Sequence, residues 1–140
     1  MLKLIAGEKG SGKTKQLIAL VNDAVSTSNG KIVCIEKGKK LTYDINHDAR
    51  LLNTEDFDVS DYDSFYGFLA GIVASDYDVK EIYVDSISKI VGNETGKISK
   101  FLDKVESLAA KEDINITMTV SRDSKELPEG IIKYVAVNIV

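Results

Sequence analysis

After Met1 the chain reads Leu2-Lys3-Leu4-Ile5-Ala6-Gly7-Glu8-Lys9-Gly10-Ser11-Gly12-Lys13-Thr14. Residues 2–6 form a short apolar run that is typical of a buried strand. Residues 7–14 match the pattern G-x-x-x-x-G-K-[ST] at every fixed position. Apolar side chains then recur at helical spacing through residue 25. We therefore expect a strand, a glycine-rich loop and an amphipathic helix in direct succession.

The residue types in this loop are suited to binding an anion. Glycine adopts backbone angles that other residues resist, so successive backbone N–H groups can turn inward around phosphate oxygens. The helix that follows adds its unpaired N–H groups and the positive end of its dipole. Lys13 would place an ammonium between the β- and γ-phosphates, and Thr14 would offer its hydroxyl to Mg²⁺. The predicted ligands are ATP and Mg²⁺, and the predicted nucleotide-binding residues are Gly7, Glu8, Lys9, Gly10, Ser11, Gly12, Lys13, Thr14 and Lys15.

The rest of the chain alternates between strand and helix patterns. Short apolar runs predict further strands at residues 31–36, 81–85, 115–120 and 134–140, with amphipathic helices between several of them. Such alternation favours a mainly parallel five-stranded sheet with helices on both faces, a three-layer α/β/α sandwich. The stretch Gly38 to Asp58 carries turn residues between two short runs, so we expect a small β-hairpin inserted after the second strand. No linker divides the chain, which predicts a single domain over residues 1–140.

Composition narrows the classes of function. The chain has 140 residues, a net charge of −4, one cysteine and one histidine. The negative charge argues against a nucleic-acid partner, because such surfaces need an excess of Lys and Arg. Cys34 and His47 are too few for a structural zinc site. No apolar run is long enough to span a bilayer, and the glycine-rich loop begins too early for a signal peptide, so we expect a cytoplasmic protein with no membrane partner.

With the loop in this setting, the chain resembles the P-loop NTPases over nearly its whole length, and in particular small stand-alone bacterial P-loop ATP-binding proteins. The glycine-rich loop corresponds to their Walker A motif. Their Walker B motif is an apolar strand that ends in an acid, and Ile82-Tyr83-Val84-Asp85 fits it. The resemblance therefore implies that Asp85 holds the metal together with Thr14. Five core strands with the acid on the third resemble the RecA-like, additional-strand branch, which implies the strand order 5-1-4-3-2.

The same resemblance leaves the water-activating residue open. Many members of the branch carry a catalytic Glu directly after the Walker B Asp, but this chain has Ser86 there. Other members place the Glu at the end of the second strand, where this chain has Glu36. One hypothesis is that Glu36 positions and deprotonates the attacking water. The alternative is that Glu36 is simply a solvated strand end.

A polar residue at the end of the fourth strand often contacts the γ-phosphate in this branch. Thr119, Ser121 and Arg122 are the candidates here. A cationic side chain near the phosphates can stabilise charge in the transition state, which would make Arg122 catalytic beside Lys13 and Glu36. The alternative for Arg122 is a surface ion pair with one of the neighbouring acids.

Three functions remain open from the sequence. The leading one is an ATP-binding hydrolase with slow or partner-stimulated ATPase activity, for which we expect a protein partner or a homo-oligomer. The second is a small-molecule kinase of the nucleoside type; thymidine kinases resemble the core but add a cysteine-rich zinc module. The third is a nucleotide-sensing interaction module with little turnover, whose partner surface would include Tyr43, His47 and Arg50. ATP is favoured over GTP because no guanine-specific motif follows Asp85.

Overall fold

The computed structural model describes residues 1–92, 96–121 and 127–139. Its strands are β1 (Leu2–Gly7), β2 (Lys31–Glu36), β3 (Arg50–Asn53), β4 (Val79–Val84), β5 (Asn115–Ser121) and β6 (Val135–Ile139). Its helices are α1 (Lys13–Thr27), α2 (Tyr62–Ser75), α3 (Ile87–Val91), α4 (Ile98–Glu112) and α5 (Glu129–Ile132), with a short 3-10 helix, η1, at Thr54–Phe57.

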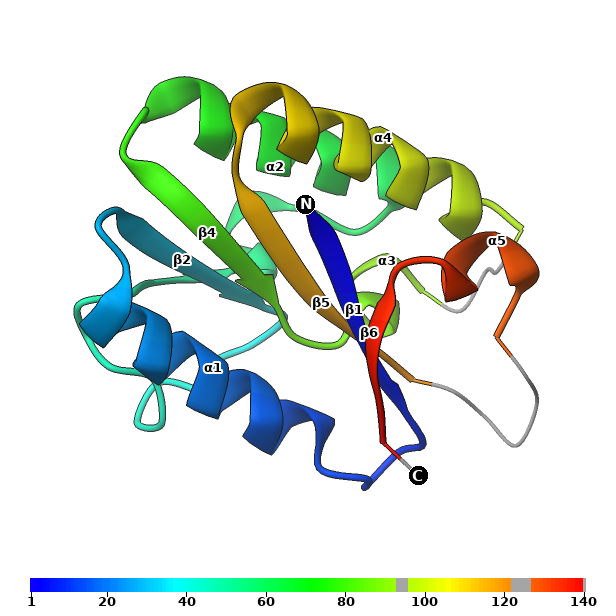
Figure 1. Cartoon of the computed structure of the whole chain (residues 1–140), viewed down its shortest axis with the longest axis horizontal. Coiled ribbons are helices and arrows are strands. Elements are labelled where there is room, and N and C mark those ends of the chain that lie inside the picture. The colour runs from blue at the N-terminus through cyan, green and yellow to red at the C-terminus, as the bar shows by residue number, and fades with distance from the viewer. Residues whose placement is uncertain (93–95, 122–126, 140) are drawn as a thin grey trace.

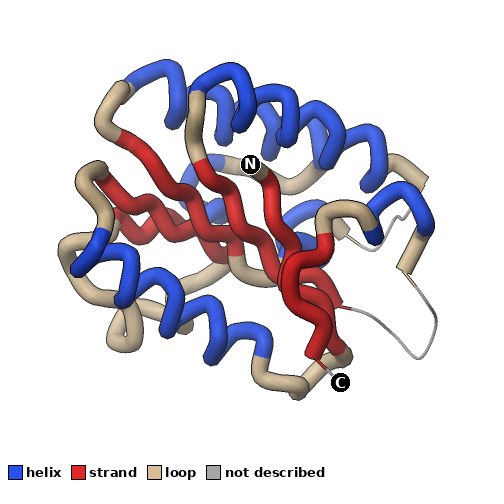
Figure 2. Tube along the Cα trace, viewed as in Figure 1, coloured by secondary structure: helices blue, strands red, loops and turns tan. Residues whose placement is uncertain are grey.

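The six strands form one parallel sheet in the order β3-β2-β4-β5-β1-β6. The sheet lies between two layers of helices, with α1 on one face and α2 and α4 on the other (Figure 1, Figure 2). The predicted α/β architecture with helices on both faces is therefore confirmed. Starting from the β6 edge, the five strands predicted from the sequence follow the order 5-1-4-3-2. β5 separates β1 from β4, which determines how the loop after β1 meets the acid after β4.

The predicted count of five strands is wrong, and so is the predicted hairpin between residues 38 and 58. Arg50–Asn53 forms a sixth strand that pairs parallel with β2, with Cys34 opposite Leu51. A hairpin would instead have two antiparallel strands within the insertion. The physical reason is that residues 37–49 run over the α1 face of the sheet and connect β2 to the parallel strand β3. Their apolar side chains are buried in the core on the α1 face, namely Leu41, Ile45 and Ala49.

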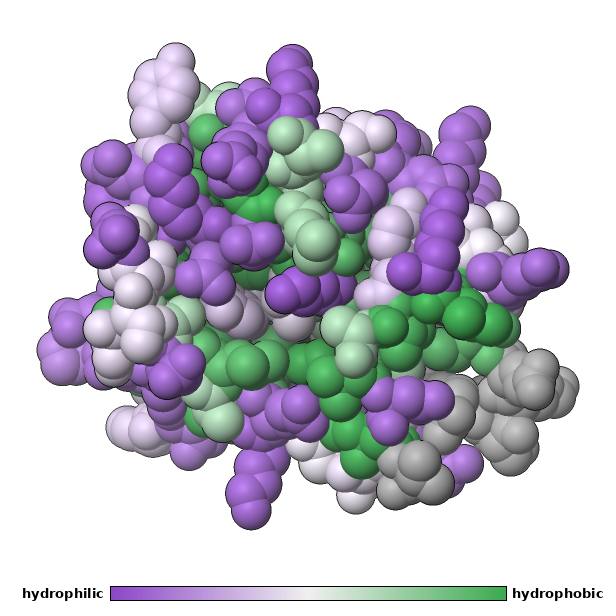
Figure 3. Space-filling view, viewed as in Figure 1, coloured by the Kyte–Doolittle hydropathy of each residue, from purple (hydrophilic) through white to green (hydrophobic). Residues whose placement is uncertain are grey.

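Each face of the sheet has its own apolar core. α2 and α4 cover the larger one, in which the rings of Phe65 and Phe101 stack with their centroids 5.7 Å apart. The smaller core lies under α1, where Leu17 and Val21 are fully buried. Figure 3 shows that the outer surface in this view is largely hydrophilic, with apolar side chains gathered on the side where β6 lies. Among the described residues, no helix combines the length and apolar character needed to cross a membrane.

Candidate functional site

The glycine-rich loop connects β1 to α1 at the carboxyl edge of the sheet. Gly10 and Gly12 have φ values of 79° and 97°, a left-handed region that disfavours residues with a Cβ. Gly12 is the N-cap of α1 and supplies no side chain to bond the first N–H groups of the helix. Those N–H groups and the positive end of the helix dipole are thus available to an anion. The structure places the loop where the sequence predicts it.

The loop also folds tightly onto the end of β1. A Cβ at Gly7 would lie 2.5 Å from Ser11 Oγ and 3.2 Å from the Cβ of Ile139, so a larger residue would have to displace both side chains. Ser11 Oγ is buried and has no hydrogen-bond partner among the described residues. A buried hydroxyl without a partner costs free energy unless a bound group completes it. A phosphate oxygen in the loop is one group that fits this hydroxyl.

Lys13 begins α1 and is buried, with 7% of its surface exposed. Its Nζ donates to the carbonyl oxygen of Glu8 at 2.8 Å, so the ammonium folds back over the loop. Burial lowers the pKa of Lys13, the negative charge of Asp85 opposes that effect, and the positive charge of Lys89 adds to it. A cation held in this position is stabilised by an anion placed beside it.

Asp85 follows β4 directly, is 8% exposed, and faces the loop. Thr14 Oγ1 donates to its two carboxylate oxygens at 3.0 and 3.2 Å. Thr119 Oγ1, on the intervening strand β5, donates to Asp85 Oδ1 at 3.1 Å and accepts from the N–H of Ser86 at 2.7 Å. The two predicted metal-binding residues, 71 positions apart in the sequence, therefore lie in direct contact. A hydroxyl and a carboxylate suit Mg²⁺, which prefers oxygen ligands and takes few of them from the protein.

Glu36 ends β2 and is 3% exposed, so it is not the solvated strand end that the sequence left open. Its two carboxylate oxygens accept the backbone N–H groups of Lys40 and Leu41 at 3.2 and 2.9 Å. Burial raises the pKa of Glu36, and the nearby charge of Asp85 adds to the rise. Glu36 thus lies near the site, but its carboxylate already holds the turn at the start of the β2–β3 connection.

The three residues that the sequence offered as contacts for the γ-phosphate differ in where they lie. Ser121 ends β5 and is paired in register with Gly7, beside the loop. Arg122 lies outside the described residues. Thr119 does lie at the site, but its hydroxyl contacts Asp85 and Ser86, a supporting role that the sequence did not indicate. Lys89, which sequence reasoning did not consider, lies on α3 just after Asp85, and its positive charge adds to the lowering of the pKa of Lys13 by burial.

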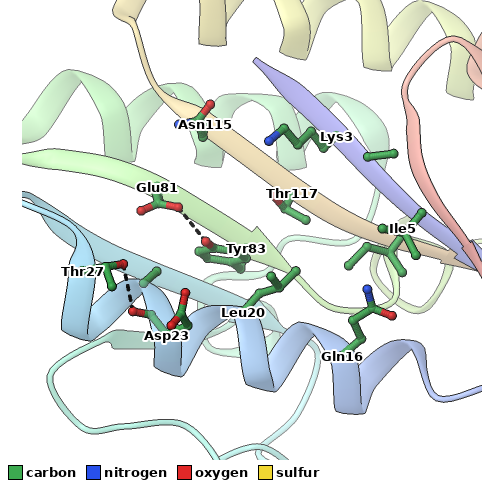
Figure 4. A pocket seen from close by; sticks show the side chains of 13 residues that line it. Lys3, Ile5, Gln16, Leu20, Asp23, Thr27, Glu81, Tyr83, Asn115 and Thr117 are labelled. Atoms are coloured by element: carbon green, nitrogen blue, oxygen red, sulfur yellow. Dashed lines mark hydrogen bonds between the residues drawn. The ribbon is translucent and has the colours of Figure 1, made fainter.

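A groove on the α1 face of the sheet lies apart from this site. Its side chains come from α1 and from the strands β4, β5, β1 and β6, and Figure 4 shows several of them converging. Within it the hydroxyl of Tyr83 donates to Glu81 Oε1 at 2.6 Å. The groove includes none of residues 7–14, nor Glu36 or Asp85, so it is separate from the phosphate loop.

The described residues contain no group of three or more His, Cys, Asp or Glu side chains that could hold a metal ion by themselves. The chain matches no protein-family model and no curated protein sequence. Function is therefore inferred from the loop, the contact between Thr14 and Asp85, and the charges around them.

Proposed function

We propose that this chain is a P-loop protein of the RecA-like branch that binds ATP with Mg²⁺ through residues 7–14. The observation that carries this proposal is the hydrogen bond between Thr14 and Asp85. The loop was recognised from its own motif, and Asp85 only as an acid at the end of a strand. Their contact across the sheet is thus independent support for a shared metal ion. The strand order, with β5 between β1 and β4, supports the same branch.

Different groups of the site would bind the phosphates and the metal ion. The N–H groups of the loop and of the first turn of α1 would surround the phosphates, and Lys13 would exchange its bond to Glu8 for phosphate oxygens. Thr14 and Asp85 would hold the ion. The chemistry that such an ion would supply is neutralisation of the negative charge on the phosphates. We place this activity in the cytoplasm.

Hydrolysis by this chain alone is slow in our proposal and is stimulated by a protein partner. The position after Asp85 is occupied by Ser86, whose side chain is not a base at neutral pH. Glu36 is the candidate for activating water, but each of its two oxygens already accepts a backbone N–H, from Lys40 and from Leu41. A partner that rearranges the β2–β3 connection would release the carboxylate.

The hydrogen bonds of Glu36 also favour a second candidate, a nucleotide-sensing module with little turnover. In that case Glu36 would remain the structural support of the β2–β3 connection. Replacing Glu36 with Gln separates the two candidates in a phosphate-release assay. Loss of hydrolysis with intact ATP binding supports the catalytic role, whereas unchanged turnover removes Glu36 from the mechanism.

Binding itself is tested by thermal unfolding of protein purified free of nucleotide. Mg-ATP at about 100 times its dissociation constant should stabilise the fold by roughly 2.7 kcal/mol. Parallel samples contain Mg-GTP, or ATP with EDTA. The variants Lys13→Ala and Asp85→Asn should lose the shift, while Lys111→Ala, which removes an exposed lysine from the last turn of α4, should keep it. No shift with any triphosphate in the wild-type protein would defeat the proposal.

A further inference from the structure

A row of polar side chains crosses the floor of the groove on the α1 face. Parallel pairing places Tyr83 of β4 opposite Thr117 of β5, and Thr117 opposite Lys3 of β1. Residues opposite each other on neighbouring parallel strands point to the same face of the sheet, and the strands lie about 5 Å apart. All three residues line the groove. A phenol, a hydroxyl and a lysine side chain are thus neighbours on this floor.

The middle residue of this row, Thr117, has a hydroxyl that the protein leaves unsatisfied. Thr117 is 8% exposed, and its hydroxyl has no hydrogen-bond partner among the described residues. The hydroxyl of Tyr83, in contrast, already donates to Glu81 Oε1. A hydroxyl that is almost buried has little room for water, so a hydrogen bond to a ligand would stabilise it. Thr117 therefore points to a ligand that presents a polar group to the middle of the groove.

Charged side chains of both signs line the groove without pairing with each other. Asp23 comes from α1, Glu81 from β4 and Lys3 from β1. Figure 4 shows the two acids at one end of the groove, with Tyr83 between them. None of the three charged side chains forms an ion pair with a described residue. Opposite charges that face one groove but do not meet favour a ligand that presents an ammonium to the acids and a carboxylate to the lysine.

Apolar side chains supply the rest of the lining. Ile5 continues the floor on β1, Leu20 extends from α1, and Val137 lies on the edge strand β6. Leu20 is 38% exposed, so an apolar group that covers it would remove apolar surface from water. The groove has a volume of about 380 Å³, which is within the range of pockets that bind small molecules.

We propose that this groove binds a small zwitterion with an apolar body, which is the chemistry of a free apolar amino acid. Its ammonium would lie between Glu81 and Asp23. Its carboxylate would face Lys3 and accept a hydrogen bond from the hydroxyl of Thr117. Its side chain would cover Leu20. The groove includes none of residues 7–14, so this inference does not rest on the proposed nucleotide binding.

NMR titration of isotope-labelled protein tests the site, because the backbone amide signals both measure weak binding and locate it. Phenylalanine and leucine are the probes, each added to about 10 mM, which detects dissociation constants in the millimolar range. At least one of them should move the signals of Tyr83 and Thr117 and leave those of residues 7–14 unchanged. Phenethylamine and isoamylamine lack the carboxylate, and phenylpropionate and methylpentanoate lack the ammonium. Each analogue should bind about fivefold more weakly than its parent amino acid, as expected for the loss of an exposed ion pair.

Two variants assign the contacts of the carboxylate. Thr117→Val fills nearly the same space without the hydroxyl and should weaken binding of the amino acid about tenfold, the effect of losing a hydrogen bond to a charged group. Lys3→Gln should weaken the amino acid about fivefold and leave the amine analogue unchanged. Lys111→Gln is the matched control, because it alters an exposed lysine on α4, on the other face of the sheet (Figure 1). Urea unfolding of each variant checks that the fold is intact.

Several results would overturn this inference. One is wild-type protein that binds neither phenylalanine nor leucine. Another is equal binding of an amino acid and its amine analogue, because nothing would then require a zwitterion. Unchanged affinity in Thr117→Val would refute the contact from the hydroxyl, and an equal loss in Lys3→Gln and Lys111→Gln would show a general effect of charge in place of a specific site. Failure of the protein to bind Mg-ATP would change none of these expectations.

Discussion

Removing the hydroxyl of Thr119 should destabilise the protein far more than removing a neighbouring hydroxyl on the same strand. Thr119 is fully buried on β5. Its hydroxyl donates to Asp85 Oδ1 at 3.1 Å and accepts from the Ser86 N–H at 2.7 Å. In Thr119→Val the methyl that replaces the hydroxyl fills nearly the same space, so the change isolates the two hydrogen bonds from the packing.

The structure allows the magnitude to be worked out. A hydrogen bond to a carboxylate contributes about 1.5–3 kcal/mol, and a buried N–H left without an acceptor costs about 1–3 kcal/mol. The two effects share one hydroxyl and are not additive, so we expect Thr119→Val to lose about 3 kcal/mol. Domains of this kind have total stabilities of about 5–15 kcal/mol, so the loss is large. Thr119→Ser keeps the oxygen and should lose much less.

Thr117→Val is the matched control. Thr117 precedes Thr119 by two residues and faces the same side of β5. Its side chain is also buried, at 8% exposed, but makes no hydrogen bond to any described residue. Urea unfolding followed by circular dichroism gives the free energy of each variant, with equal slopes confirming comparable unfolded states. If Thr119→Val is within about 0.5 kcal/mol of Thr117→Val, the hydroxyl bridge between Asp85 and Ser86 does not exist.

Two further predictions concern other buried groups near the site. Burial raises the pKa of Glu36 above its ordinary value of 4.5, so the folded chain binds this proton more tightly than the unfolded chain does. Stability contributed by this group is therefore lost as the pH rises from the ordinary pKa of 4.5 through the higher folded pKa. The stability of Glu36→Gln relative to wild type, measured by urea unfolding across that range, should rise with pH; a constant difference would contradict the burial of a titrating carboxyl. Burial also raises the pKa of the Cys34 thiol to about 12, so a thiol reagent at mildly alkaline pH should label it only after denaturant is added, and prompt labelling of the folded protein would contradict this.

The sequence predicts the parts of the fold whose signal is local. Residues 2–14 carry their own pattern, and β2, β4 and β5 are short apolar runs whose burial is required by any parallel sheet. The segment between Gly38 and Asp58 was misread because turn residues do not say whether the next strand returns beside its predecessor or crosses over. Tertiary burial favours the crossover, because Leu41 and Ile45 are buried in the core under α1 when the connection runs over that face of the sheet.

The sequence likewise predicts only the part of the candidate site whose signal is local. The loop and Asp85 could be predicted, because each sits at the end of an apolar strand and the order of the strands brings those ends together. The roles of Thr119 and Glu36 could not, because they depend on which atoms face each other across β5 and the β2–β3 connection. The sequence does not show whether the carboxylate of Glu36 faces solvent or, as in the structure, accepts two backbone N–H groups.

The proposed binding of Mg-ATP and its proposed hydrolysis would make different demands on this geometry. An ion held by Thr14 and Asp85 needs the lone pairs of the Thr14 hydroxyl, so that hydroxyl must stop donating to the carboxylate. Thr119 can keep its bond to Asp85 during this exchange and so hold the carboxylate in place. The proposed binding would thus require only small rotations of the Thr14 and Asp85 side chains, which are already in contact. For the proposed hydrolysis, Glu36 would in addition have to accept a proton from water while its oxygens hold two backbone N–H groups of the β2–β3 connection, so a partner that moves this connection would act at that step.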